Sequence, residues 1–190
     1  MSILTEISEQ IKSCEKCGLC KTRTNAVPGS GNPNADIMFI GEGPGKNEDL
    51  KGEPFIGAAG KFLDELLNGI ELKRSDVFIT NIVKCRPPEN RDPKPDEVAS
   101  CYSYLERQVA LIKPKLIVLL GRHAMYRFLP RDLQISKVHG EPIEHKGIAT
   151  EKQIYLPMYH PAFALYNGSY RAILHKDFAR IPKLLKINTI

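Results

Sequence analysis

Five cysteines are the residues of this sequence whose spacing most directly suggests chemistry. Cys14 and Cys17 form a C-x-x-C pair, Cys20 repeats that spacing, and Cys85 and Cys101 follow much later in the chain. A close pair and two distant cysteines can place four thiolates around zinc or an iron–sulfur cluster. The spacing does not choose between these metals, and buried free thiols are the alternative for Cys85 and Cys101. Since a four-ligand site has no room for a fifth thiol, we interpret Cys20 as a spare that could replace Cys17.

A glycine-rich turn follows the first apolar run, in the segment IMFIGEGPGKNED. Gly41, Gly43 and Gly45 would let a ligand approach backbone N–H groups closely, and Pro44 stiffens the turn. The pattern matches neither a P-loop nor G-x-G-x-x-G, so phosphate binding is not favoured. An ordinary strand-to-helix turn is the alternative.

Three further side chains lie in loops that could form a site. Phe55, in the loop GEPFIGAAG, is either a core anchor or a stacking surface. Asn81 follows an apolar run in FITNIVKCRPP and carries both a donor and an acceptor. His160, in PMYHPAFALYNGS, is as often a structural hydrogen-bonding residue as a catalyst. Each residue alone is ambiguous.

Short apolar runs alternate with helical patterns along the chain. The runs predict strands at Asp36–Ile40, Val77–Thr80, Leu116–Leu120 and Ile154–Met158. Helical periodicity predicts three helices with apolar faces, the second beginning at Pro95. The faces are Phe62, Leu63, Leu66, Leu67 and Ile70; Val98, Cys101, Leu105, Val109 and Ile112; and Leu174, Phe178, Ile181 and Leu185. This alternation indicates an α/β fold with a mostly parallel sheet covered by helices on both faces, whose ligand would bind beyond the strands' carboxyl ends.

Composition narrows the class of protein. A chain of 190 residues with 42% hydrophobic content suits one domain, 1–190. No apolar stretch is long enough to span a bilayer, so we expect a soluble, cytoplasmic protein without a membrane partner. The net charge of +5 suits a polyanionic partner without demonstrating one. In such a compartment metal binding by cysteines is favoured over disulfides.

Taken in order, the segments GEGPGKNED, GEPFIG, TNIVKCRPPENR, the C-x-x-C start and HPA resemble the family 4 uracil-DNA glycosylases. The resemblance runs from about Cys14 to the final helix and implies a three-layer αβα fold with a four-stranded, mostly parallel sheet. It also implies one structural 4Fe-4S cluster on Cys14, Cys17, Cys85 and Cys101. The expected substrate is uracil-containing DNA, single- or double-stranded, and the expected product is an abasic site in base excision repair.

The resemblance gives the loop residues roles that fit their chemistry. A glycosylase must extrude its target base into a pocket. Phe55 would stack on uracil, and the amide of Asn81 would accept from N3–H and donate to O4, which cytosine cannot match. The turn from Gly41 through Glu42, Gly43 and Pro44 to Gly45 would line the pocket. Glu48 is expected to exclude the methyl group of thymine, because Gly45 replaces the tyrosine that does so in better-known relatives.

Cleavage of the glycosidic bond leaves a uracil anion, which His160 is expected to stabilise by donating a hydrogen bond. Gly43 stands where many members of the superfamily have an aspartate, so a general base is missing there. Either Glu42 orients the attacking water, or anion stabilisation provides most of the rate. We favour anion stabilisation, because a cation-like sugar needs little nucleophilic assistance.

Other contacts with DNA are expected outside the base pocket. Lys84, Arg86, Arg91 and Arg171 could bind phosphates, although solvated surface is the alternative for each. A residue within Ala162–Tyr166 could fill the gap left by the extruded base. We expect a monomer, with a sliding clamp as a possible partner.

Three other functions compete with this interpretation. A non-catalytic iron–sulfur or zinc nucleic-acid-binding module would explain the cysteines and the charge, but not Phe55, Asn81 and His160. A redox protein would use the cluster for electron transfer. A sister glycosylase would accept hypoxanthine or thymine mispairs, which Asn81 and Glu48 argue against.

Overall fold

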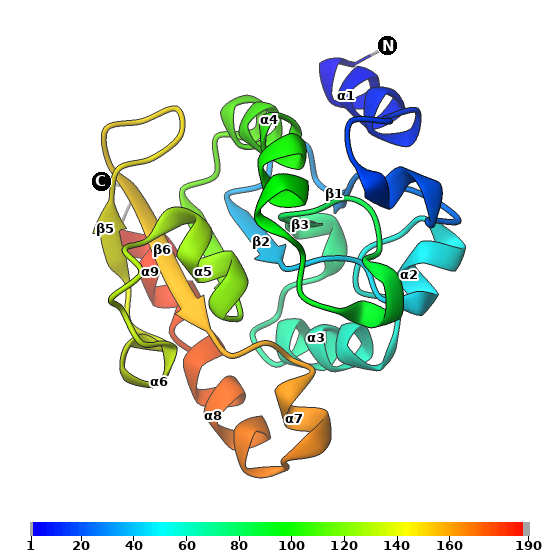
Figure 1. Ribbon diagram of the computed structural model, residues 1–190. Coiled ribbons are helices and arrows are strands. Elements are labelled where there is room, and N and C mark those ends of the chain that lie inside the picture. Colours follow the sequence, from blue (N-terminus) through cyan, green and yellow to red (C-terminus); the bar gives the residue numbers. More distant parts are fainter. Residues whose placement is uncertain (1, 188–190) are drawn as a thin grey trace.

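The computed structural model describes residues 2–187, and a six-stranded sheet of order β1-β3-β2-β4-β6-β5 forms its centre (Figure 1). The four inner strands, β3, β2, β4 and β6, are parallel, and the short edge strands β1 and β5 are antiparallel to their neighbours. The strands are β1 (Ser30–Gly31), β2 (Ile37–Gly41), β3 (Phe78–Asn81), β4 (Leu116–Leu120), β5 (Ile143–His145) and β6 (Gln153–Met158).

The four strands predicted from apolar runs are the four parallel strands, each within one residue of its expected bounds. The mostly parallel α/β sheet is therefore confirmed, but the sheet has six strands where four were expected. The two additional strands contain only two and three residues, none of them fully buried. Strands so short and so exposed have no apolar run by which they could be predicted.

Helices cover both faces of the sheet, which gives three layers (Figure 1). Side chains alternate along β2, so Phe39 packs towards α3, α8 and α9, whereas Met38 packs towards α4 and α5. The helices are α1 (Ile3–Lys12), α2 (Lys46–Lys51), α3 (Ala58–Asn68), α4 (Pro95–Ile112), α5 (Arg122–Phe128), α6 (Ile135–Val138), α7 (Phe163–Tyr166), α8 (Ser169–Phe178) and α9 (Ile181–Ile187). Short 3-10 turns lie at Gly18–Lys21, Arg74–Asp76 and Pro88–Asn90.

The C-terminal helical pattern divides into two helices rather than one. α8 ends at Phe178 and α9 begins at Ile181. Pro182 explains the interruption, because it has no backbone N–H and its ring would clash with the carbonyl of the preceding turn. The apolar face is kept across the break: Leu174, Phe178 and Ile181 are all buried in the same core.

The order of the parallel strands determines where a ligand can bind. β2 pairs with β3 on one side and with β4 on the other, so successive connections leave the sheet in opposite directions. Such a switch point opens a crevice at the carboxyl ends of the strands. The loops after β2, β3 and β6 meet at this edge. Within residues 2–187, no helix is both long and apolar enough to cross a membrane.

Candidate active site and cysteine cluster

A cavity of about 330 Å³ opens at the carboxyl edge of the sheet. Phe55, Asn81 and His160, predicted from three separate loops, all line this cavity. Its other lining residues are Glu42, Gly43, Gly45, Glu48, Ala59, Asn90, Ala162 and Tyr166. The predicted residues therefore meet around one space, although Gly41 and Pro44 are not in its wall.

Asn81 is the last residue of β3, and its side chain is almost fully buried, with 1% exposure. Its Oδ1 atom has no hydrogen-bond partner among the residues that the structure describes. A buried amide oxygen without a partner costs free energy, so a donor from a ligand would be favoured there. Gly41 makes the close approach possible, because a Cβ at this position would lie 2.5 Å from that oxygen.

Phe55 is fixed in an unusual backbone conformation, with φ at +53°. A bulky residue rarely adopts this left-handed region, so surrounding contacts must hold it there. The Arg74 guanidinium donates to the carbonyls of Pro54 and Phe55 and forms an ion pair with Asp64. Gly60 on α3 leaves the space that the Phe55 carbonyl occupies. The aromatic ring is thus positioned before any ligand arrives.

The imidazole of His160 lies beside Phe55, with ring centroids 5.6 Å apart and the planes 29° from parallel. Its Nδ1 atom accepts a hydrogen bond from the backbone N–H of Ala162 at 3.2 Å. An accepting Nδ1 requires the neutral ring to carry its proton on Nε2. Burial lowers the pKa of His160 to about 4, so the neutral, Nε2-donating form is present at neutral pH.

Glu48, on α2, connects the glycine-rich turn to the Phe55 loop. Its Oε1 atom accepts from the backbone N–H groups of Ile56 and Gly57, at 2.9 and 2.7 Å. Its Oε2 atom lies beside Gly45, 2.8 Å from where a Cβ would be. Glu48 therefore both holds the loop that carries Phe55 and presents an oxygen at the cavity wall.

Glu42, a predicted site residue, also belongs to a second group of side chains whose other members, Asp92 and His123, the sequence did not predict. His123 Nε2 lies 3.7 Å from the Glu42 carboxylate and 3.2 Å from that of Asp92. Burial raises the pKa of Glu42, while the nearby His123 opposes this shift. The position of His123 was the available signal, since it is the second residue of α5 and lies three residues after the end of β4, one of the four predicted strands.

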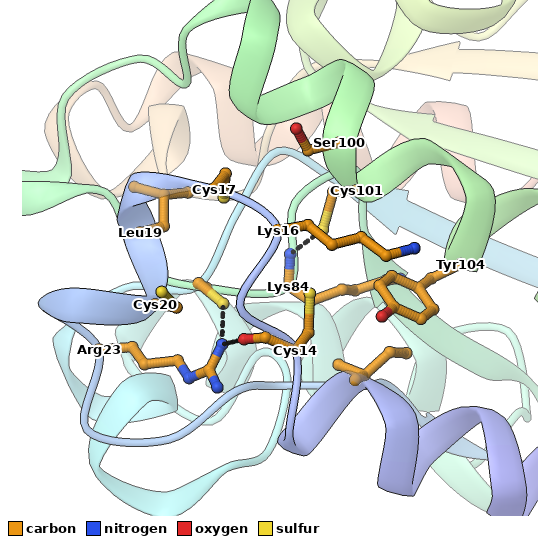
Figure 2. Close-up of a pocket in the computed structure, with 12 residues that line it drawn as sticks. Cys14, Lys16, Cys17, Leu19, Cys20, Arg23, Lys84, Ser100, Cys101 and Tyr104 are labelled. Carbon is orange, nitrogen blue, oxygen red and sulfur yellow. Dashed lines mark hydrogen bonds between the residues drawn. The ribbon is translucent and has the colours of Figure 1, made fainter.

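All five cysteines line a second cavity, between α1 and α4 (Figure 2). Cys14, Cys17 and Cys20 come from the segment after α1, Cys85 follows β3, and Cys101 lies on α4. The predicted ligand set is thus brought together from three parts of the chain. Cys20 lies at the same cavity, so its position does not set it apart from the other four.

Nitrogen donors face two of the sulfur atoms. Arg23 Nη1 lies 3.2 Å from Cys85 Sγ. It also donates to the carbonyl of Cys14, as Figure 2 shows. The backbone N–H of Lys84 donates to Cys101 Sγ at 3.2 Å. Burial raises the pKa of the Cys101 thiol to about 11, so metal binding would have to displace its proton.

The spacing of the sulfur atoms can be compared with the spacing of ligands around a single zinc ion. Four thiolates around a single zinc ion would lie about 3.8 Å apart, given Zn–S bonds of about 2.3 Å. Among the described residues, no three cysteine sulfurs lie within 4.8 Å of one another; only Glu42, Asp92 and His123 bring potential ligand atoms that close. The cysteine sulfur atoms are therefore not grouped as closely as the four ligands of one tetrahedral zinc ion.

The basic residues expected to bind DNA phosphates have partners within the protein. Lys84 is the clear correction, because it is buried, with 1% exposure, and donates to the Asn81 carbonyl and to Gln108. Arg91 binds both carboxylate oxygens of Glu97, and Arg171 binds both of Glu65. Arg86 donates to Asn90. A lysine so enclosed cannot reach a phosphate, and it braces the strand end that carries Asn81 instead.

A six-stranded, mostly parallel sheet with a cavity at its carboxyl edge defines an α/β protein that binds its ligand at a strand switch point. Residues 28–182 match the model of the uracil DNA glycosylase superfamily, so the chain belongs to this superfamily. Among its relatives are type-4 uracil-DNA glycosylases of Sulfurisphaera tokodaii, Archaeoglobus fulgidus and Thermotoga maritima. The Sulfurisphaera tokodaii protein is 50% identical, over 97% of this chain and 86% of its own length. The Archaeoglobus fulgidus protein is 50% identical, over 97% of this chain and 94% of its own length. The Thermotoga maritima protein is 43% identical, over 95% of this chain and 93% of its own length. The chain is accordingly a member of the type-4 group.

Proposed function

We propose that this protein removes uracil from DNA by hydrolysing the N-glycosidic bond, leaving an abasic site for base excision repair. One observation carries the proposal: the unpaired Oδ1 atom of Asn81 lies in a cavity bounded by the rings of Phe55 and His160. Uracil offers what such a cavity requires, a flat ring with a donor and an acceptor on one edge. Membership of the type-4 group supports the same activity.

Recognition of the base depends on the amide of Asn81. Its oxygen accepts from uracil N3–H, and its nitrogen donates to O4. Cytosine has an acceptor at N3 and a donor at C4, so both contacts would become repulsive. Two buried groups left unpaired cost about 1–3 kcal/mol each, enough to discriminate strongly against cytosine.

Release of the base depends on stabilising the anion that leaves. The Nε2–H of His160 donates to O2, where negative charge develops. The Ala162 N–H fixes the ring and its tautomer in advance, so no reorganisation is needed during the reaction. Since burial keeps His160 neutral, it supplies a hydrogen bond without protonating the base.

Glu42 is the residue that could orient the attacking water, and we assign it a smaller contribution to the rate than His160. Glu42 lines the cavity, and its carboxylate also faces His123, whose Nε2 atom lies 3.2 Å from the Asp92 carboxylate. We assign Glu42 the orientation of water and assign most of the rate to stabilisation of the anion. A cation-like sugar reacts readily with water once the base has left.

Glu48 and Tyr166 border the pocket and have different proposed roles. We assign Glu48 the exclusion of the thymine methyl group, because its Oε2 atom lies at the cavity wall beside Gly45. Tyr166, on α7, borders the cavity and is 91% exposed, the most exposed of the large apolar side chains described. We assign Tyr166 the role of filling the gap in the DNA that the extruded base leaves.

We further propose that Cys14, Cys17, Cys85 and Cys101 bind one 4Fe-4S cluster, with Cys20 as a spare thiol. Sulfurs too widely spaced for one ion and two N–H donors aimed at them support this assignment. Such a cluster supplies a covalent cross-link between the segment after α1, the end of β3 and α4. Because Lys84 connects the same region to Asn81, the cross-link would steady the base pocket.

The ligand set is tested by comparing Cys17→Ser with Cys20→Ser. Iron and acid-labile sulfide are measured in each purified protein, together with its visible absorption. We expect Cys20→Ser to keep wild-type iron and Cys17→Ser to lose most of it. Full iron content in Cys17→Ser with loss in Cys20→Ser would exchange the two assignments.

The activity is tested with an oligonucleotide that contains one uracil, followed by alkaline cleavage at the abasic site. We expect cleavage with wild-type protein and no cleavage with the matching cytosine strand. A non-catalytic binding module or an electron-transfer protein would bind or be reduced without releasing base. Binding of the uracil strand by cluster-loaded protein without any base release would reject the proposed function.

A further inference from the structure

A further cavity has no role in the chemistry above. It measures about 510 Å³ and lies between α4 and α5, which are neighbours in Figure 1. Tyr102 and Tyr126 supply aromatic surface, and His123, Arg127 and Arg131 supply its basic groups. No carboxylate is among its lining residues, so the charged side chains that line it are positive.

The arginines of this cavity differ from all others in the chain. The sequence contains ten arginines, and eight of them hydrogen-bond or ion-pair within the protein. For Arg127 and Arg131 the described structure contains no such partner. The Nε atom of Arg127 is buried and unpaired, and its guanidinium lies 3.3 Å from the centroid of the Tyr102 ring.

A buried guanidinium donor without an acceptor favours an anionic ligand. Arg127 is also restrained by its contact with Tyr102, so little side-chain entropy would be lost when an anion binds. Arg131 is exposed beside it and can provide a second positive charge. The pair therefore offers two cations on a wall that also provides aromatic faces.

The cavity is also a direct neighbour of the base pocket. His123 lines this cavity, Glu42 lines the base pocket, and their side chains lie 3.7 Å apart. A strand that delivers a nucleotide to the base pocket must continue on one side of it. The next nucleotides are the nearest source of an anion joined to a flat ring.

We propose that the Arg127–Arg131 cavity binds a phosphodiester of the DNA strand next to the extruded uridine, with an adjacent base packed against its tyrosines. This inference rests on the proposed uracil-DNA activity and adds a subsite to it. The site binds the backbone and reads no sequence, so it serves single-stranded and double-stranded substrates alike.

The test is a ladder of single-stranded oligonucleotides that carry a non-hydrolysable 2′-fluoro-uridine, extended one nucleotide at a time on either side. Affinity is measured by fluorescence anisotropy for wild type, Arg131→Gln, Arg127→Gln and Arg107→Gln. Arg107 is the matched control, because it lies on α4 but binds Gln10 of α1. Melting curves for each variant exclude unfolding, and the exposed Arg131 provides a substitution that leaves the core intact.

We expect the affinity of wild type to increase when the strand is lengthened on one side of the uridine. For the lengthened strand, the affinity of the two cavity variants should be about 5- to 20-fold lower than that of wild type. The slope of log affinity against log salt should fall by about 0.7 per arginine removed. Arg107→Gln should behave as wild type. An equal loss of DNA affinity in all three variants would mean that only net charge matters, which would contradict the proposal. The proposal would also be overturned if the cavity variants gained affinity with strand length as wild type does. The proposed function fails separately, if wild type releases no uracil.

Discussion

The Cα atom of Gly41 faces the side-chain oxygen of Asn81 so closely that a Cβ at Gly41 would lie 2.5 Å from it. The same Cβ would lie 2.6 Å from the ring of Phe55. The glycine-rich turn thus contributes space behind the pocket rather than a wall of its own. This role differs from the expected one, in which the glycines expose backbone N–H groups to a ligand.

Substituting Gly41 should therefore damage the pocket more than the fold. In Gly41→Ala the new methyl group must displace either the Asn81 amide or the Phe55 ring, so we expect uracil release to fall by about 100-fold or more. Gly168→Ala is the control, because a Cβ there meets nothing within 4 Å. Single-turnover rates and melting temperatures are measured together. Wild-type rates in Gly41→Ala would show that the amide and the ring need not lie so close.

Asn81, His160 and Glu42 have different roles, so substituting them should lower the rate of uracil release by different amounts. Asn81→Ala and His160→Ala should each lower the single-turnover rate by about 10²–10³-fold, because each removes a contact to the base or to the leaving anion. Glu42→Gln should cost about tenfold or less, since an amide can still orient water. Similar losses in all three variants would contradict anion stabilisation as the main source of rate.

Much of this arrangement follows from the sequence, for identifiable reasons. The strands β2, β3, β4 and β6 have apolar runs that are buried on both faces, and these runs place Asn81 and His160 at the same edge of the sheet. The contacts that fix the pocket join residues distant in sequence. Arg74 and Gly60 hold the Phe55 loop through backbone contacts that no local pattern encodes.

Charge was the least predictable feature. Lys84 follows a strand in a basic segment, so the sequence predicts a surface residue. In the structure Thr80, Asn81 and Gln108 enclose its ammonium group. Burial lowers its pKa to about 7. Arg127 and Arg131 carry no motif, and only their missing partners distinguish them. The choice of partners depends on tertiary packing, which sequence spacing does not specify.

The depressed pKa of His160 predicts a pH-dependent contribution to stability. The folded-state pKa is about 4 and the usual value is 6.5, so between these values the unfolded chain binds a proton that the native state does not. Stability from this group is therefore complete above about pH 6.5 and is lost as pH falls towards 4. We expect the unfolding free energy of wild type to fall more steeply over this interval than that of His160→Gln.

Chemical denaturation at pH 7, 6, 5 and 4 measures the difference between the two proteins. Because the other titrating groups are shared, they cancel in the comparison. Parallel curves for wild type and His160→Gln would mean that the imidazole titrates normally in the native state.

The two oxygens of Glu48 have separable roles. Glu48→Gln keeps an oxygen for the N–H groups of Ile56 and Gly57, so the Phe55 loop should stay in place. Glu48→Ala removes this support and also opens the wall beside Gly45. We expect Glu48→Ala to lose at least tenfold in uracil release and to gain measurable thymine release from a G·T mispair, with Glu48→Gln close to wild type. Thymine release by Glu48→Gln but not by Glu48→Ala would contradict the steric explanation.

The central claim is that the amide of Asn81 and the imidazole of His160 bind one uracil ring against Phe55. It is tested most directly by adding free uracil to ¹⁵N-labelled protein and following the Asn81 side-chain amide and the His160 Nε2–H by NMR. We predict saturable shifts of both signals with uracil and none with cytosine. Shifts confined to other parts of the protein, or equal responses to the two bases, would contradict the account.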